Sequence, residues 1–160
     1  MIIDKNVDIK NAEMRNIFHL AQACVAEANP QKKVAMTHEV AQQFFADELN
    51  LDDYPAPENI KAPGRPQKPI LVSPKALPHR GMGTLEGRAC FLHAIAHIEF
   101  NAINLAWDAV YRFRNMPKEY YADFVKVASD EARHFTMLSQ RLTDMNVAYG
   151  DFEAHNGLWE

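Results

Sequence analysis

The sequence predicts an all-α protein, a helical bundle arranged around one antiparallel pair of long helices. Apolar residues recur at helical spacing in several segments, and two of these segments are long. No segment alternates apolar and polar residues in the way that a half-buried β-strand does. A chain of 160 residues with 48% hydrophobic residues can bury one core, so we expect a single domain over residues 1–160.

Composition and charge limit the functions that the chain can have. The net charge of -4 and the pI of about 6.0 favour neither nucleic acid nor an anionic membrane as a general partner. The two cysteines, Cys24 and Cys90, are typical of reduced thiols rather than of a disulfide framework. Since the sequence has neither a signal peptide nor an apolar run of about 20 residues, we predict a soluble, cytoplasmic protein.

Residues 1–54 are predicted to form two amphipathic scaffold helices. The first runs from Asn11 to Glu27, and the "ANP" sequence that follows ends its pattern. Its apolar side chains are Met14, Ile17, Phe18, Ala21 and Val25. The second helix is expected in "KVAMTHEVAQQFFADEL", from Lys33 to Leu49.

Residues 55–83 are predicted to form an extended strap. Seven of the nine prolines lie between Pro55 and Pro78, and this density excludes a regular helix. The strap is also basic, with no Asp or Glu from residue 61 to residue 80. Its basic residues are Lys61, Arg65, Lys68, Lys75 and Arg80. They are either solvated or in contact with phosphates or an acidic partner. They are too weak a feature to identify RNA as a partner.

Residues 84–147 are predicted to form a long helical hairpin. The first helix begins with Thr84 as its N-cap and Glu86 in its first turn, and it ends near Arg112. The connection "RNMP" places Pro117 in the first turn of the second helix, which runs from about residue 118 to Met145. Because the connection is short, the two helices are antiparallel neighbours.

Glu99 interrupts the apolar stretch "HAIAHIEFNAINLAWDAV" in the first long helix. At about 100° per residue, Glu99 shares its face with a set of apolar side chains. They are Leu92, Ile95, Ile103, Ala106 and Val110. An unpaired buried carboxylate is very costly, so we expect a basic side chain or a metal ion to face Glu99.

The segment "EARH" places Glu131 and His134 together on the second long helix. Apolar side chains share the face of Glu131, and His134 lies on the adjoining part of that face. These side chains are Phe124, Val127, Ala128, Phe135, Leu138 and Leu142. In carboxylate-bridged bundles one helix supplies a Glu and the next supplies a Glu-x-x-His pair, whose donors suit iron and manganese. We therefore predict that Glu99, Glu131 and His134 bind metal.

Arg88 offers an alternative that needs no metal. It lies about three turns before Glu99 on the same face and could pair with one of the carboxylates. In that case the chain would be a helical interaction module without catalytic activity.

The remaining histidines are predicted to have interface or supporting roles. His97 lies roughly opposite Glu99, and His93 lies well to one side. Their "HAIAH" spacing is that of zinc proteases, but Ala94 stands where the general-base Glu is needed. His155 and Trp159 lie in the predicted loop 148–160, which either folds over a site or packs through its aromatic side chains.

Four segments together resemble an uncharacterised bacterial family of ferritin-like proteins, the domain of unknown function four-five-five. They are "RPQKPILVSPKALPHRG", "EGRACFLHAIAHIEFNAINLAWDAVYRF", "ASDEARHF" and "YGDFEAHNGLW". The resemblance covers about residues 63–159. Members are sometimes labelled rhodanese-related, a name that these residues give no reason to accept.

The resemblance implies a ferritin-like bundle with a di-iron or di-manganese carboxylate site. Glu99 matches the first carboxylate position, and Glu131 with His134 matches the first Glu-x-x-His. The family continues for about another hundred residues with a second set of ligands, as the resemblance has it. We therefore expect a fragment with half of a site, completed by a missing C-terminal half or by a second copy in a homodimer.

The resemblance also implies a function. The leading hypothesis is a metal-dependent oxidoreductase that activates dioxygen or a peroxide, with Glu99, Glu131 and His134 as ligands. The alternative is metal storage or detoxification, which needs a closed shell of many subunits.

Overall fold

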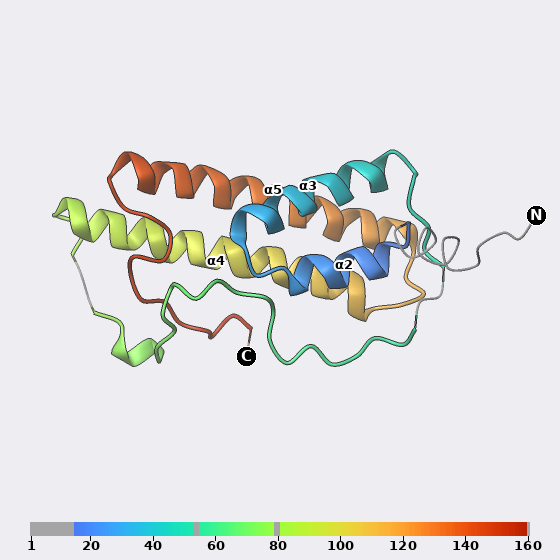
Figure 1. Cartoon of the computed structure of the whole chain (residues 1–160), viewed down its shortest axis with the longest axis horizontal. Helices are drawn as coiled ribbons and strands as arrows, with labels where there is room; N and C mark the ends of the chain where they lie inside the picture. Colours follow the sequence, from blue (N-terminus) through green and yellow to red (C-terminus); the bar gives the residue numbers. More distant parts are fainter. Residues whose placement is uncertain (1–14, 53–54, 79–80, 160) are drawn as a thin grey trace, which may run out of the picture.

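The computed structural model describes residues 15–52, 55–78 and 81–159, and in these ranges the chain is all-α. The described residues form four α-helices and one short 3-10 helix, with two isolated β-bridges and no strand. The helices pack side by side as an elongated bundle (Figure 1). The predicted all-α bundle is confirmed.

Two short helices cover one side of the bundle. Helix α2 (Ile17–Ala26) begins after Asn16, whose side chain accepts hydrogen bonds from the backbone N–H groups of Phe18 and His19. Helix α3 (Pro30–Phe45) begins after Asn29, which caps it in the same way. α2 packs on α4 and α3 packs on α5, so the two short helices lie alongside the two long ones (Figure 1).

The two long helices form the centre of the fold. Helix α4 (Leu85–Arg112) begins at the cap Thr84, whose hydroxyl accepts from the backbone N–H of Gly87. Helix α5 (Lys118–Asp144) returns antiparallel to α4 along most of its length (Figure 1). The face of α4 that packs on the other helices is centred on four side chains that are at most 1% exposed. They are Ala96, Phe100, Ile103 and Trp107.

The described residues of the strap, 55–78 and 81–83, run along α4 without regular structure except for η1 (Pro74–Ala76). The strap is held by backbone hydrogen bonds at two places. The N–H of Gly64 donates to the carbonyl of Val25 at the end of α2, where a Cβ on residue 64 would lie 2.1 Å from the Ala26 oxygen. Farther along, Val72 pairs with Ala154 of the C-terminal segment, residues 148–159. The strap and this segment lie together below α4 (Figure 1).

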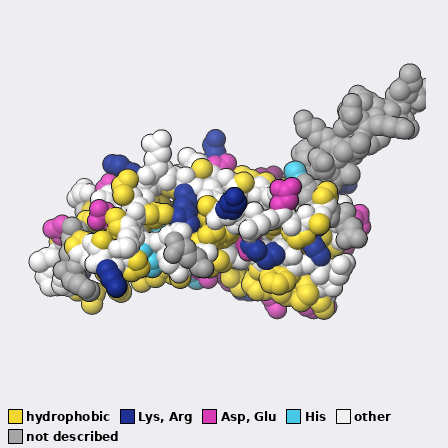
Figure 2. Space-filling model, turned by 90° about the horizontal axis from the view of Figure 1, so that it is seen from below, with side chains coloured by type: hydrophobic (Ala, Val, Ile, Leu, Met, Phe, Trp, Pro, Cys, Tyr) yellow, Lys and Arg dark blue, Asp and Glu magenta, His cyan; other side chains and the backbone are white. Residues whose placement is uncertain are grey.

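The side of the molecule seen in Figure 2 mixes hydrophobic, basic and acidic side chains without a single continuous charged region. Within the described ranges, no helix is long and apolar enough to cross a membrane.

The predicted boundaries of three helices need correction. The first helix begins at Ile17, because the Asn16 cap and its bridge to Asn50 lie there, and Met14 lies outside the described residues. The second helix begins at Pro30 and ends at Phe45, two residues before Asp47 takes a left-handed conformation with φ 60°. Pro117 is the N-cap of α5 rather than a residue of its first turn.

Candidate metal centre

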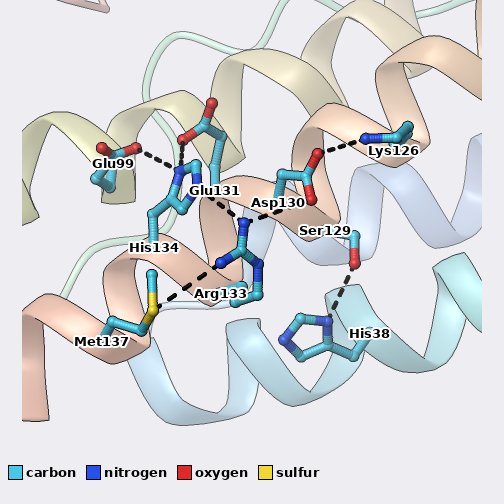
Figure 3. A network of polar contacts seen from close by, with 9 residues as sticks. All are labelled: His38, Glu99, Lys126, Ser129, Asp130, Glu131, Arg133, His134 and Met137. Carbon is cyan, nitrogen blue, oxygen red and sulfur yellow. Dashed lines mark hydrogen bonds and ion pairs between the residues drawn. The ribbon is translucent and has the colours of Figure 1, made fainter.

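Glu99 on α4 and the pair Glu131 and His134 on α5 lie together, as Figure 3 shows. The Nδ1 atom of His134 is 3.0 Å from Oε2 of Glu131 and 3.7 Å from Oε2 of Glu99. One ligand atom from each residue can be chosen so that all three lie within 4.8 Å of one another. We call these three residues the carboxylate–histidine cluster. It is the one such group of potential metal ligands among the described residues.

The antiparallel pairing of α4 and α5 positions the cluster at the edge of their interface. The side chains of Glu99, Glu131 and His134 are 20%, 23% and 36% exposed. The stripe that carries Glu99 was expected to be fully buried, and this expectation is wrong at its N-terminal end. Leu92, Ile95 and Glu99 are only half-buried, because the packing of α2 and α5 covers the adjoining face of α4. The cluster is therefore accessible from one side.

Hydrogen bonds fix the proton of the His134 ring. Arg133, which can only donate, places Nη2 3.1 Å from Nε2 of His134, so Nε2 is the acceptor. In the neutral ring the proton then lies on Nδ1, which donates to the Glu131 carboxylate. A cation that binds at Nδ1 requires this proton to move to Nε2, and the Arg133 guanidinium would then have to turn away from Nε2.

The two carboxyl groups perturb each other. Burial, together with the Glu131 carboxyl that faces it, raises the pKa of Glu99 to about 7. A hydrogen bond from Glu99 lowers the pKa of Glu131 below its ordinary value. Near neutral pH the pair therefore tends to hold one shared proton, which occupies the place that a cation would take.

Arg88 does not neutralise the cluster. Its side chain is exposed, and its guanidinium donates to the carbonyl of Met82 instead. Within the part of the chain that the structure describes, the carboxylates of Glu99 and Glu131 face His134, and no Lys or Arg pairs with either carboxylate. The alternative that a buried Arg88 explains Glu99 is wrong.

His93 and His97 are buried on α4 but do not belong to the cluster. Nε2 of His97 donates to the carbonyl of His155, and Nδ1 accepts from the Tyr149 hydroxyl, at 3.0 and 2.9 Å. Nε2 of His93 accepts from the N–H of Gly150 at 2.9 Å. These contacts attach the C-terminal segment to α4, as the predicted interface role requires. Burial lowers the pKa of both histidines, to about 4 in His93.

The C-terminal segment covers a different face of α4 from the one that carries Glu99. The backbone of His155 contacts His97, and Nε1 of Trp159 donates to the carbonyl of Lys61 in the strap. The loop therefore packs through its aromatic side chains and does not cover the cluster.

The sequence analysis missed a second polar group, which lies in the core. Lys33 of α3 is fully buried, and its ammonium donates to the carbonyls of Cys24 and Val25 and to Oδ1 of Asn104. Lys33 lies one turn before Thr37 on the buried face of α3, so the helical period could have identified it.

The fold and the cluster define an all-α bundle with two carboxylates and an imidazole at one helix interface. Residues 26–160 match the family described as "Protein of unknown function (DUF455)", and the chain belongs to this family. A similar protein is an uncharacterized protein of Haemophilus influenzae, 42% identical over 161 residues, which cover 93% of this chain and 55% of the relative. The chain thus spans about half the length of the curated relative that it matches. No solved structure matches the chain.

Proposed function

We propose that Glu99, Glu131 and His134 are the ligands of half of a dinuclear iron or manganese site in a ferritin-like, metal-dependent oxidoreductase. The observation that carries this proposal is the meeting of two carboxylates and an imidazole, with no Lys or Arg paired to either carboxylate in the described structure. Two facing carboxylates repel each other unless a proton or a cation lies between them.

The donor set fits iron or manganese. Carboxylates can bridge two cations, and imidazole is a common ligand of both metals. Glu99 and Glu131 would each supply an oxygen, and Nδ1 of His134 would supply the nitrogen. Arg133 and Glu131 orient the ring before metal binds, because they contact its two nitrogens.

The cluster supplies too few ligands for two metal ions. Di-iron bundles use a Glu from each of two helices and a Glu-x-x-His from each of two more, and this chain contributes one of each. The other donors would come from the remaining part of a longer protein or from a second copy of this chain. Iron in a completed site would supply the redox chemistry with dioxygen or peroxide, and the partial exposure of the cluster leaves room for a substrate.

The proposal is tested by oxygen consumption after anaerobic loading with Fe(II). We expect the longer Haemophilus relative to consume oxygen faster than the same concentration of free Fe(II). In this chain, Glu131→Gln should abolish any excess over free Fe(II), whereas the exposed control Glu119→Gln should not. A rate equal to that of free Fe(II) in the relative would overturn the oxidoreductase proposal. Retention of many irons per chain in a large multisubunit particle would indicate storage instead.

A further inference from the structure

A cavity of about 390 Å³ lies between α4, the strap and the C-terminal segment. This volume is in the range of small-molecule sites, which is about 300–1,000 Å³. Three segments that are distant in the sequence form its walls. They are the strap at Leu77, Pro78 and Met82, one face of α4 from Gly87 to Ile98, and the C-terminal segment from Asp151 to Leu158.

Backbone contacts hold these walls in place. The N–H of Val72 donates to Ala154 at 2.8 Å, and the N–H of Ala154 donates to Ile70 at 3.0 Å. His97 binds the carbonyl of His155 and so fixes the same segment to α4. At the N-terminal end of α4, Gly87 allows the strap to approach the helix, since a Cβ on residue 87 would lie 1.9 Å from the Gly81 oxygen. Contacts within the chain therefore fix the positions of all three walls.

Most of the side chains that line the cavity are apolar. Met82, Phe91 and Ile98 are 59%, 51% and 42% exposed, so a ligand would remove a large apolar surface from water. The polar groups are few. Nδ1 of His155 accepts from the N–H of Gly157, which leaves Nε2–H of the neutral ring as a donor. The carboxylates of Asp151 and Glu153, both exposed to solvent at the rim, offer acceptors.

The cavity is separate from the carboxylate–histidine cluster. The α4 residues that line it include Phe91, Ala94 and Ile98, which share one helical face. Glu99 follows Ile98 and is therefore rotated by about 100° around the helix axis, and it is absent from the lining. The cavity is therefore not part of the proposed metal site.

We propose that this cavity is a binding site for an uncharged, mainly apolar small molecule that carries one hydrogen-bonding group. The apolar walls bind the body of the ligand, and His155 or Asp151 binds its polar group at the rim. This assignment is independent of the proposed metal function.

The first test is a fluorescence titration with N-phenyl-1-naphthylamine, a neutral aromatic amine that becomes bright in apolar surroundings. Ala94→Phe adds a ring inside the cavity, and overfilling should weaken binding by about tenfold. Ala102→Phe makes the same change on α4 outside the cavity and should leave binding unchanged. Thermal melting of both variants checks that each one folds.

The second test uses the two thiols. Cys90 lines the cavity and is half-buried, whereas Cys24 is fully buried, and burial raises its pKa to about 12. Iodoacetamide should therefore modify Cys90 first, and saturating N-phenyl-1-naphthylamine should slow that reaction at least about fivefold, because the dye occupies the approach to the thiol.

Three results with this chain alone would overturn the proposal. They are no dye binding by the natural chain, equal binding by Ala94→Phe and the natural chain, and unchanged Cys90 reactivity at saturating dye. Binding by this chain but not by the longer relative would also overturn it, because the cavity would then be a surface that the rest of the protein covers. Metal loading is not part of either assay, so failure here is distinguishable from failure of the metal proposal.

Discussion

Two polar groups flank α4, and they differ in how their charge is balanced. The first contains Lys33, whose ammonium lies in the core and donates to three oxygens of the protein. The second is the carboxylate–histidine cluster, in which two acidic groups face each other with only an imidazole between them. The Lys33 group is closed within the fold, whereas no Lys or Arg of the described residues pairs with the carboxylates of the cluster.

This difference distinguishes the structural role of Lys33 from the metal-binding role proposed for the cluster. Lys33 is 0% exposed, and burial lowers its pKa to about 8, so its place in the core depends on its three acceptors. The cluster is partly exposed, and its carboxyl groups are balanced by a shared proton and a histidine. A polar group that the protein itself satisfies stabilises the fold, whereas the proposed metal function needs carboxylates that no basic side chain neutralises.

The largest effect is expected from Lys33→Met. The substitution leaves the oxygens of Cys24, Val25 and Asn104 without this donor inside the core. We expect the free energy of unfolding to fall by about 4 kcal/mol. Urea denaturation measures it, with the exposed neighbour Lys32→Met as the control, which should change stability by less than about 0.5 kcal/mol. Equal stability of the two variants would show that the Lys33 contacts do not stabilise the fold.

The buried side chain of His93 makes the free energy of unfolding depend on pH. Burial, and then the nearby His97, lower its pKa from 6.5 to about 4, with a small opposite effect of Asp151. The unfolded chain therefore binds more protons than the folded chain between these values, and stability falls as pH falls through this window. The loss is about 3 kcal/mol at about 1.36 kcal/mol per unit of pKa.

The variant His93→Gln keeps an acceptor for the Gly150 N–H but does not titrate. Urea denaturation at several pH values should show that the natural chain loses about 3 kcal/mol more than this variant between pH 6.5 and 4. Parallel losses in both proteins would contradict a neutral, buried His93.

The smallest effect is expected from Glu99→Gln in metal-free protein at pH 8. The substitution removes one of two facing carboxylates, so it should raise the free energy of unfolding by about 1 kcal/mol. The control Glu119→Gln, on the exposed surface of α5, should change little. A marked loss of stability in Glu99→Gln would mean that the cluster is closed like the Lys33 group and that the comparison fails.

The sequence alone predicted the helices of the fold, because helical periodicity and capping residues such as Thr84 can be recognised from neighbouring residues. It also predicted which residues form the cluster, since Glu99 and the Glu131–His134 pair lie on helices that a short connection makes antiparallel. It could not predict which face of α4 is core. That helix is apolar over a wide arc, and the packing of α2 and α5 decides that Phe100 is buried while Glu99 lies at the edge.

Long-range contacts were also beyond the sequence. His97 is buried because Tyr149 and the backbone of His155 fold back over it. No local sequence pattern predicts that the C-terminal segment packs there. The partners of Lys33 belong to α2 and α4, far from it in the sequence.

The most direct test of the central claim is a titration of the metal-free chain with Mn²⁺, followed by calorimetry. The account predicts saturable binding to the natural chain, release of protons on binding, and at least about a hundredfold weaker binding by Glu131→Gln, because a ligand is lost. Glu119→Gln should bind like the natural chain. No saturable binding, or equal binding by Glu131→Gln and the natural chain, would contradict the assignment of this cluster as a metal site.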